Sequence, residues 1–293
     1  MKTLSLKGCG TALITPFRNG NVDYEAFARL VGRQTTAGIH FLVPLGTTGE
    51  TPCLDENEKI RILEISKELG QGKTIIAGGG TNSLSGTIKS IKLLESHGAD
   101  AFLIVVPYYN KPTQTGLYEY FKAVSESSDK PIVMYNVPGR TGSNMTAETA
   151  LRLAEIENIV AIKEASGNYS QISEIIRNAP EGFSVLSGND DETLSLMATG
   201  ASGVISVASN IAPELMVCLT EALLRNDIAT ARELHHKLSP LFRNCFIESN
   251  PIPAKAGLSA MGLIANELRL PLTSATDATY TTMQQTIADL GLR

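Results

Sequence analysis

The sequence predicts an α/β fold, namely a (β/α)8 TIM barrel with a C-terminal helical extension. Short apolar runs recur at regular intervals, and each is bounded by Gly, Pro or Asn, which is typical of buried strands. The runs are continuously apolar, which indicates that both faces of each strand are covered, as in a parallel sheet with crossover helices. Eight such units within residues 1–225 favour a closed barrel, and an open doubly wound sheet is the alternative.

The expected strands differ in composition, but they are similar in length and are bounded by the same types of residue. They are GTALITP (10–16), FLVPLG (41–46), TIIAGG (74–79), AFLIVVP (101–107), PIVMYNV (131–137), IVAIKEA (159–165), FSVLSG (183–188) and GVISVAS (203–209). Helical periodicity between them is clearest at residues 24–38, 55–70 and 85–98. These stretches fit the crossover helices that a parallel barrel requires.

The rest of the chain is predicted to be helical, over residues 227–246, 253–263 and 277–290. No low-complexity linker precedes this part, so we expect it to pack on the barrel. The predicted organisation is a catalytic barrel over residues 1–225 and a helical domain over residues 226–293.

Composition excludes several classes of protein. With 43% hydrophobic and 19% charged residues, the 293-residue chain is neither disordered nor collagen-like. Its net charge of -5 lacks the basic excess that nucleic-acid binding requires, and its apolar runs are far shorter than the roughly 20 residues of a membrane helix. These two observations predict neither a nucleic-acid nor a membrane partner. Four scattered cysteines, without a CxxC pair or a secretory leader, predict free thiols and a cytoplasmic location.

Two glycine-rich motifs and the histidines suggest functions that their context does not support. The segment LGQGKT (69–74) has Lys67 where a phosphate-binding loop needs glycine, and it leads into a strand instead of a helix. Residues 78–80, GGG, could present backbone N–H groups to an anion, but a tight turn is the favoured interpretation. The four histidines lack metal-ligand spacing and are expected at the surface. We expect neither a metal nor a cofactor.

The carboxyl ends of the strands, where a TIM barrel builds its active site, carry reactive side chains. Lys163 lies in the apolar run IVAIKEA, where an ammonium ion is at risk of burial. One interpretation is a lysine that reaches solvent or pairs with Glu164. The other is a Schiff-base amine, because desolvation favours the neutral form that attacks a ketone. The company of other reactive groups at the strand ends favours the second interpretation.

The neighbouring strand ends also allow two interpretations each. Tyr135 could fill the top of the barrel or relay protons. Thr47 and Thr48 could cap a turn, or could offer hydroxyl and backbone N–H groups to a small carboxylate. Arg140 could be a solvated loop cation or a bidentate clamp for the carboxylate of a second substrate.

Seven motifs along the chain resemble those of one enzyme family. They are GTTGE, PYYNKPTQTGLYEYF, YNVPGRTG, IKEASGN, LSGND, GVISV and NPIPAK. In this order and at these intervals, from Gly8 to about Leu272, they resemble the dihydrodipicolinate synthases of bacterial lysine biosynthesis. The resemblance implies a metal-free class I lyase that condenses pyruvate with L-aspartate 4-semialdehyde to form 4-hydroxy-2,3,4,5-tetrahydrodipicolinate, on the diaminopimelate route to lysine.

The resemblance also implies a role for each matching residue. Lys163 is the amine that forms the pyruvate imine, and Tyr135 is the proton donor and acceptor. Thr47 and Tyr109, the latter from the neighbouring subunit, complete a proton relay. The other matches bind substrate, namely Thr48 and the backbone of Ile205 for pyruvate, Gly188 through its backbone, and Arg140 for the semialdehyde carboxylate. A shared site implies at least a dimer, usually within a homotetramer that is a dimer of dimers.

Members of the family that lysine inhibits bind this effector between subunits, and the matching positions here depart from their pattern. Two histidines after GTTGE and a glutamate after the third strand are replaced by Glu56, Lys59 and Gly86, although Asn82 and Tyr108 are kept. A lost carboxylate partner and an added like charge predict weak or absent inhibition by lysine.

Two alternative functions stay open at the level of sequence. A pyruvate-dependent aldolase acting on a sugar acid, such as an N-acetylneuraminate lyase, shares the imine lysine and the tyrosine, but the GTTGE spelling and Arg140 favour the synthase branch. A non-catalytic ligand-binding barrel is disfavoured, because binding alone needs no nucleophile and proton relay together.

Overall fold

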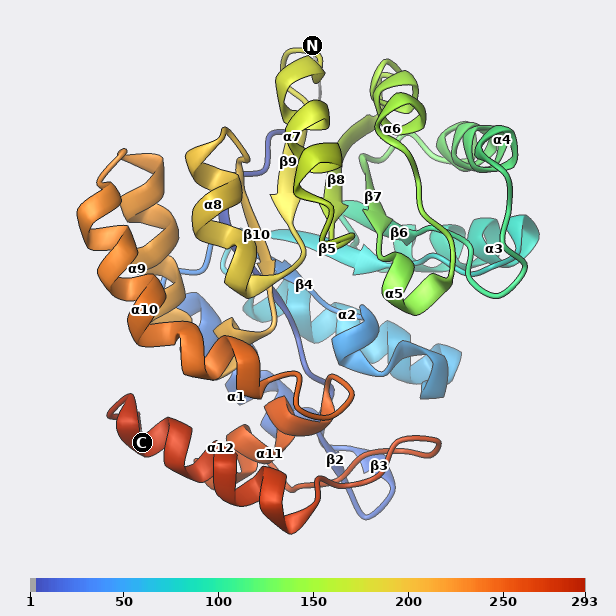
Figure 1. The fold of residues 1–293 in the computed structure, drawn as a ribbon. Coiled ribbons are helices and arrows are strands. Elements are labelled where there is room, and N and C mark those ends of the chain that lie inside the picture. The colour runs from blue at the N-terminus through green and yellow to red at the C-terminus, as the bar shows by residue number, and fades with distance from the viewer. Residues whose placement is uncertain (1–3, 293) are drawn as a thin grey trace.

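The structure is a computed structural model and describes residues 4–292 (Figure 1). At its centre, parallel strands close into a barrel, because β1 pairs with β10 on one side and with β4 on the other. The predicted TIM barrel is confirmed, and the open sheet is wrong, since every strand of the described barrel has two neighbours. The eight strands are β1 Gly8–Ala12, β4 Phe41–Val43, β5 Thr74–Gly78, β6 Ala101–Val105, β7 Ile132–Asn136, β8 Ile159–Glu164, β9 Ser184–Ser187 and β10 Gly203–Ser206.

The N-terminal segment differs from the sequence prediction in two ways. The first strand, Gly8–Ala12, begins and ends earlier than predicted, and the chain then leaves the barrel. An unpredicted hairpin follows, formed by β2 Phe17–Arg18 and β3 Asn21–Val22. Asn19 and Gly20 form its turn with φ angles of 53° and 79°, a left-handed conformation that this pair adopts readily.

Helices connect the strands and surround the barrel, as parallel connections require (Figure 1). Most begin after a polar residue whose side chain caps the first turn, and Asp55 and Glu58 form a reciprocal capping box at α2. The three helices predicted from periodicity are present as α1, α2 and α3. The helices of this part are α1 Tyr24–Thr36, α2 Glu56–Leu69, α3 Leu84–Glu95, α4 Gln114–Ser125, the short α5 Pro138–Thr141, α6 Ala147–Ala154, α7 Tyr169–Asn178, α8 Thr193–Ala198 and α9 Pro213–Leu224.

Two apolar layers explain why the strand sequences are continuously hydrophobic. Val43 and Leu103 belong to the cluster that fills the barrel interior. Their neighbours Leu42 and Phe102, on the same strands, belong to the cluster between the sheet and the helices. Because successive side chains of a strand point to opposite faces, burial of both faces leaves no polar positions to alternate with apolar ones.

Three further helices follow the barrel, α10 Ile228–Asn244, α11 Ile252–Ala260 and α12 Asp277–Asp289. The predicted helical extension is confirmed, and the boundary expected at residues 225/226 falls in the turn between α9 and α10. In Figure 1, α11 and α12 lie at the same end of the molecule as the hairpin β2–β3. The segment between α11 and α12 is hydrogen-bonded to the hairpin, since the backbone N–H of Asn19 donates to Glu267 at 2.8 Å.

The predictions about cysteines and histidines are confirmed. All four cysteines are free thiols, as predicted. Of the histidines, His236 is exposed, whereas His40, His97 and His235 are partly exposed, so all four reach the surface as predicted. His40 Nδ1 accepts a hydrogen bond from the backbone N–H of Cys9 at 3.1 Å and thus helps to hold β1. Over residues 4–292, no helix combines the length and apolarity that crossing a membrane requires.

Candidate active site

Two adjoining cavities lie where the strands end and their loops begin. The smaller one, about 50 Å³, contains Lys163, and the larger one, about 440 Å³, extends over the ends of β4, β5 and β6. Seven residues line both cavities: Gly46, Thr47, Leu103, Tyr135, Val137, Arg140 and Asn250. A small molecule bound beside Lys163 is therefore continuous with space for a second molecule.

Lys163 is a buried amine that faces the barrel interior. It lies on β8 in register with Tyr135 of β7, it is 6% exposed, and its Nζ lies 4.2 Å from the centre of the Tyr135 ring. Among residues 4–292, no carboxylate lies within ion-pair distance of Lys163. The interpretation of this residue as a solvated lysine is therefore wrong.

Glu164 faces the opposite side of β8, because side chains alternate along a strand. Its carboxylate accepts hydrogen bonds from Asn136 Nδ2 at 2.8 Å and from Gln171 Nε2 at 3.1 Å. Burial raises the pKa of Glu164, and these hydrogen bonds oppose the shift. Pairing of Lys163 with Glu164 is therefore also wrong, and the Lys163 amine is left for chemistry in the cavity.

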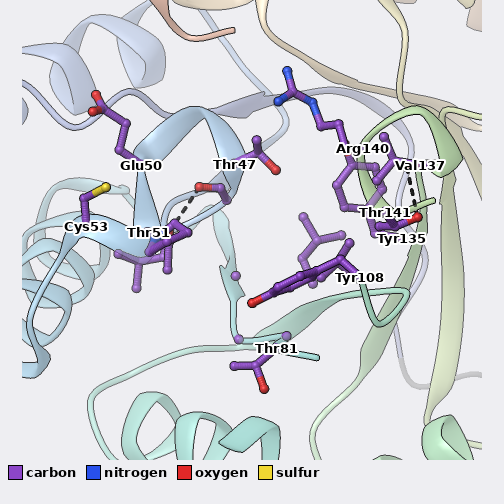
Figure 2. A pocket seen from close by; sticks show the side chains of 18 of the residues that line it. Thr47, Glu50, Thr51, Cys53, Thr81, Tyr108, Tyr135, Val137, Arg140 and Thr141 are labelled. Carbon is purple, nitrogen blue, oxygen red and sulfur yellow. Dashed lines mark hydrogen bonds between the residues drawn. The ribbon is translucent and has the colours of Figure 1, made fainter. Parts of the chain in front are cut away.

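A second buried lysine, Lys255 of α11, has a different environment. It is fully buried and its Nζ donates to Glu50 Oε1 at 2.5 Å and to the backbone oxygen of Glu267 at 2.8 Å. Burial lowers the pKa of Lys255 to about 8, although Glu50 opposes the shift. Lys255 lines neither cavity; Glu50 is among the residues that line the larger one, but its carboxylate points away from Tyr135 and Arg140 in Figure 2. The Lys255 amine is therefore engaged in a buried ion pair and does not face the space beside Lys163.

The two threonines of GTTGE lie in a short 3₁₀ turn, Thr47–Gly49, that follows β4. Thr47 is exposed and lines both cavities, whereas Thr48 is buried and lines the cavity of Lys163. Glu50 ends the turn with a left-handed φ of 52°, and its buried ion pair with Lys255 holds that backbone in place. The turn therefore presents both hydroxyls at the mouth of the barrel on a fixed backbone.

Arg140 belongs to the short helix α5, which directly follows β7. Its side chain lines both cavities, and its Nη2 donates to the backbone oxygen of Asn250 at 3.5 Å. Figure 2 shows Thr47, Tyr135, Tyr108 and Arg140 around the larger cavity. A guanidinium between the two cavities is placed to bind the carboxylate of a molecule that approaches Lys163.

Gly188 and Ile205 have different relations to Lys163. A Cβ on Gly188 would lie 2.7 Å from Ala165 Cβ and 3.1 Å from Lys163 Cε, so only glycine leaves the lysine side chain its room. Gly188 also lines the smaller cavity, as expected. Ile205, on β10, is fully buried in the barrel interior and lines neither cavity, so its expected backbone role stays a prediction.

The structure does not bring Tyr109 to Lys163 of its own chain. Tyr109 is 89% exposed, lines neither cavity and has a left-handed φ of 74°, which is uncommon for a bulky residue. Tyr108, in contrast, lines the larger cavity. The backbone oxygen of Asn82 accepts a hydrogen bond from Asn110 Nδ2 at 2.9 Å, which ties this residue to the loop that carries both tyrosines.

Two features of the site were not predicted from sequence. Asn250 links Thr48 and Arg140, and the Glu50–Lys255 ion pair supports the GTTGE turn. Both Asn250 and Lys255 lie in the NPIPAK motif, for which the family resemblance implies no role of either residue. Within residues 4–292, no three His, Cys, Asp or Glu side chains are grouped as metal ligands.

The chain is similar to known proteins over almost its whole length. The model of the dihydrodipicolinate synthetase family matches residues 5–290. The 4-hydroxy-tetrahydrodipicolinate synthase of Thermotoga neapolitana is 48% identical over 291 residues, covering 98% of this chain and 99% of that protein. The solved structure of dihydrodipicolinate synthase from Thermotoga maritima has a TM-score of 0.97 at 45% identity and covers 99% of this chain and 100% of that one. The enzyme from Acinetobacter baumannii, solved in complex with pyruvate, has a TM-score of 0.96 at 39% identity with the same coverage, 99% and 100%. The chain therefore belongs to the dihydrodipicolinate synthetase family.

Proposed function

We propose that this chain condenses pyruvate with L-aspartate 4-semialdehyde to form 4-hydroxy-tetrahydrodipicolinate, the activity for which its relatives are named. The observation that carries the proposal is Lys163, a buried amine without an ion-pair partner in residues 4–292, which lines a cavity with Tyr135 and Thr48. The enzyme is a lyase of the class I aldolase type, as predicted. A relative that is 48% identical is named 4-hydroxy-tetrahydrodipicolinate synthase, which disfavours both a sugar-acid aldolase and a non-catalytic barrel.

The first half of the reaction converts pyruvate into a nucleophile. The Lys163 amine attacks C2 of pyruvate, and the resulting carbinolamine loses water to leave an imine. Tyr135, whose ring packs against the amine, donates the proton that the leaving hydroxyl takes up, with Thr47 as its relay. Tyr135, which has given up its proton, then accepts one from C3, and the resulting enamine carries the reactive electron pair at C3.

The second half joins the two substrates. The enamine C3 attacks the aldehyde carbon, which forms the new C–C bond while the aldehyde oxygen takes up a proton. The amino group of the second substrate then adds to C2, closes the ring and releases the Lys163 amine. One water is lost overall and no electrons are exchanged with an outside reagent. During these steps Thr48 binds the carboxylate of pyruvate and Arg140 binds that of the semialdehyde.

Trapping of the imine tests the proposal directly. The protein is incubated with pyruvate and borohydride, and its intact mass and peptide map are then measured. One adduct per chain on Lys163 is the expected result. Lys255 serves as an internal control, because it is fully buried, lines neither cavity and is expected to stay unlabelled. A chain that forms no adduct, or forms it elsewhere, would contradict the proposed chemistry.

Arg140→Ala is expected to weaken the use of the semialdehyde and to spare the pyruvate imine. A hydrogen bond to a charged group contributes about 1.5–3 kcal/mol, so kcat/KM for the semialdehyde falls roughly 10- to 150-fold. Trapping of pyruvate on Lys163 is measured in parallel and is expected to be unchanged. Semialdehyde kinetics like those of the wild type would remove Arg140 from this role.

A second copy of the chain is proposed to complete each site. Tyr109 is expected in the proton relay, yet it projects into solvent away from its own Lys163. A tyrosine held in a left-handed backbone conformation, directly after Tyr108 of the larger cavity, suits insertion into a neighbouring site. The homotetramer, as a dimer of dimers, and the cytoplasmic location stay predictions.

Lysine is expected to inhibit this enzyme weakly or not at all. Glu56 forms an exposed ion pair with Lys89 at 2.6 Å, and Lys59 adds a positive charge to the larger cavity. Gly86 has no side chain, so this position supplies no carboxylate for an amino group. A Cβ there would lie 2.9 Å from Thr81 Oγ1. Initial rates at increasing lysine concentration check the prediction, and strong inhibition below millimolar lysine would overturn it.

A further inference from the structure

Asn250 lies between the two residues proposed to bind the carboxylates of the substrates. It belongs to the loop between α10 and α11, is 5% exposed and lines both cavities. Its side-chain Nδ2 donates to Thr48 Oγ1 at 3.0 Å, and its backbone oxygen accepts from Arg140 Nη2 at 3.5 Å. A single residue of the C-terminal helical part thus contacts the binding groups on both sides of the barrel mouth.

The side-chain contact determines what the Thr48 hydroxyl can do. A hydroxyl has one proton to donate and lone pairs to accept with, whereas an amide nitrogen only donates. Thr48 Oγ1 is therefore the acceptor in its bond with Asn250, and its own proton stays free. The Thr48 side chain makes no other hydrogen bond within the described residues. Thr48 lines the cavity of Lys163, so its free O–H group can donate to an anion bound there.

We propose that Asn250 is a positioning residue that keeps the Thr48 hydroxyl a donor toward the carboxylate of pyruvate. This inference rests on the proposed function, in which Thr48 binds that carboxylate. Asn250 Oδ1 is buried and accepts no hydrogen bond from residues 4–292. A residue kept only for packing would not leave a buried acceptor unsatisfied, because an apolar side chain of similar size would avoid that penalty. The need for a neutral group that donates a hydrogen bond to Thr48 explains why this position carries an amide.

Two variants of Asn250 test the direction of this hydrogen bond. Asn250→Asp keeps the shape but accepts the Thr48 proton and adds a negative charge beside the pyruvate carboxylate. The pyruvate concentration that gives half-maximal borohydride trapping is expected to rise more than about tenfold. Asn250→Ala only frees the hydroxyl to rotate, and the expected rise is about fivefold. Maximal labelling of Lys163 is expected to be retained in both variants.

The order of the two effects separates positioning from packing. A packing role predicts that alanine, which leaves a cavity, impairs the protein more than the isosteric aspartate, and that Tm falls in the same order. Trapping by Asn250→Asp with the pyruvate dependence of the wild type, or a larger effect of Asn250→Ala, would overturn the inference. The first of these outcomes would also mean that the amide presents its oxygen to Thr48.

A double-mutant cycle tests whether Asn250 acts through Thr48. Thr48→Val removes the hydroxyl, so Asn250→Ala is expected to change the half-saturating pyruvate concentration by less than about twofold in that background. Independent, additive effects would contradict the inference. The wild type separates the two claims, because a wild type that forms no adduct contradicts the proposed function itself. A wild type that is labelled, with additive variants, contradicts only the role of Asn250.

Discussion

Lys163→Met is expected to abolish turnover and pyruvate trapping while leaving the fold at least as stable as that of the wild type. Loss of the nucleophile removes the imine and the enamine together, so kcat/KM falls by at least about 10⁴-fold, on the order of the loss seen when other covalent catalysts lose theirs. Lys163 is 6% exposed and has no ion-pair partner within residues 4–292, so a thioether of similar length removes a buried polar group without breaking an ion pair. Steady-state assays and thermal unfolding measure the two effects.

Lys163→Arg is the matched control for this prediction. Arginine keeps a positive charge in the cavity but stays protonated and forms no imine, so it is expected to be as inactive as methionine. Activity in the arginine variant would mean that the charge, and not the amine, carries the reaction. A large drop of Tm in the methionine variant would mean that Lys163 has a structural role that its contacts do not show.

The main features of the barrel and of its site could be predicted because they follow from local sequence. Continuous apolar runs report strands buried on both faces, and helical periods between them report the crossovers. Once a closed parallel barrel is inferred, the ends of its strands meet at one face. Lys163 and Tyr135 end neighbouring strands and are paired in register, so their proximity is already implied by the topology.

The features that the sequence did not predict depend on contacts between distant parts of the chain. The hairpin β2–β3 has strands of two residues, too short for a periodicity, although Asn19-Gly20 is a strong turn signal. Asn250 and Thr48 are 202 residues apart, and no local pattern reports the hydrogen bond between them. The proposed insertion of Tyr109 into a neighbouring site would be a property of an assembly, which no local pattern in one chain reports.

Lys255→Met is expected to have the opposite effect to Lys163→Met, a large loss of stability. Lys255 and Glu50 are 0% and 1% exposed at their side chains, and the Lys255 ammonium also lies 4.2 Å from the Phe17 ring centre. Removal of one partner leaves Glu50 as a buried charge without its main partner, which costs about 3–5 kcal/mol. For a chain of this size, Tm falls on the order of 10 °C. Thermal unfolding monitored by circular dichroism measures the shift, and Lys89→Met, at the exposed pair with Glu56, is expected to leave Tm unchanged.

The double variant Glu50→Gln/Lys255→Met separates the cost of an unpaired charge from the contribution of the pair itself. With both charges gone, most of the stability is expected to return. The attraction between the charges is lost, but so is the cost of burying them, and these two energies are of similar size. Glu50 also accepts a hydrogen bond from the backbone N–H of Arg269 at 3.2 Å, which glutamine can still accept. Since Glu50 ends the turn that presents Thr47 and Thr48, activity is a second measure of the pair. Recovery of Tm without recovery of kcat would mean that the ion pair serves to hold the turn in its active geometry. Recovery of neither would mean that the pair is needed for folding itself.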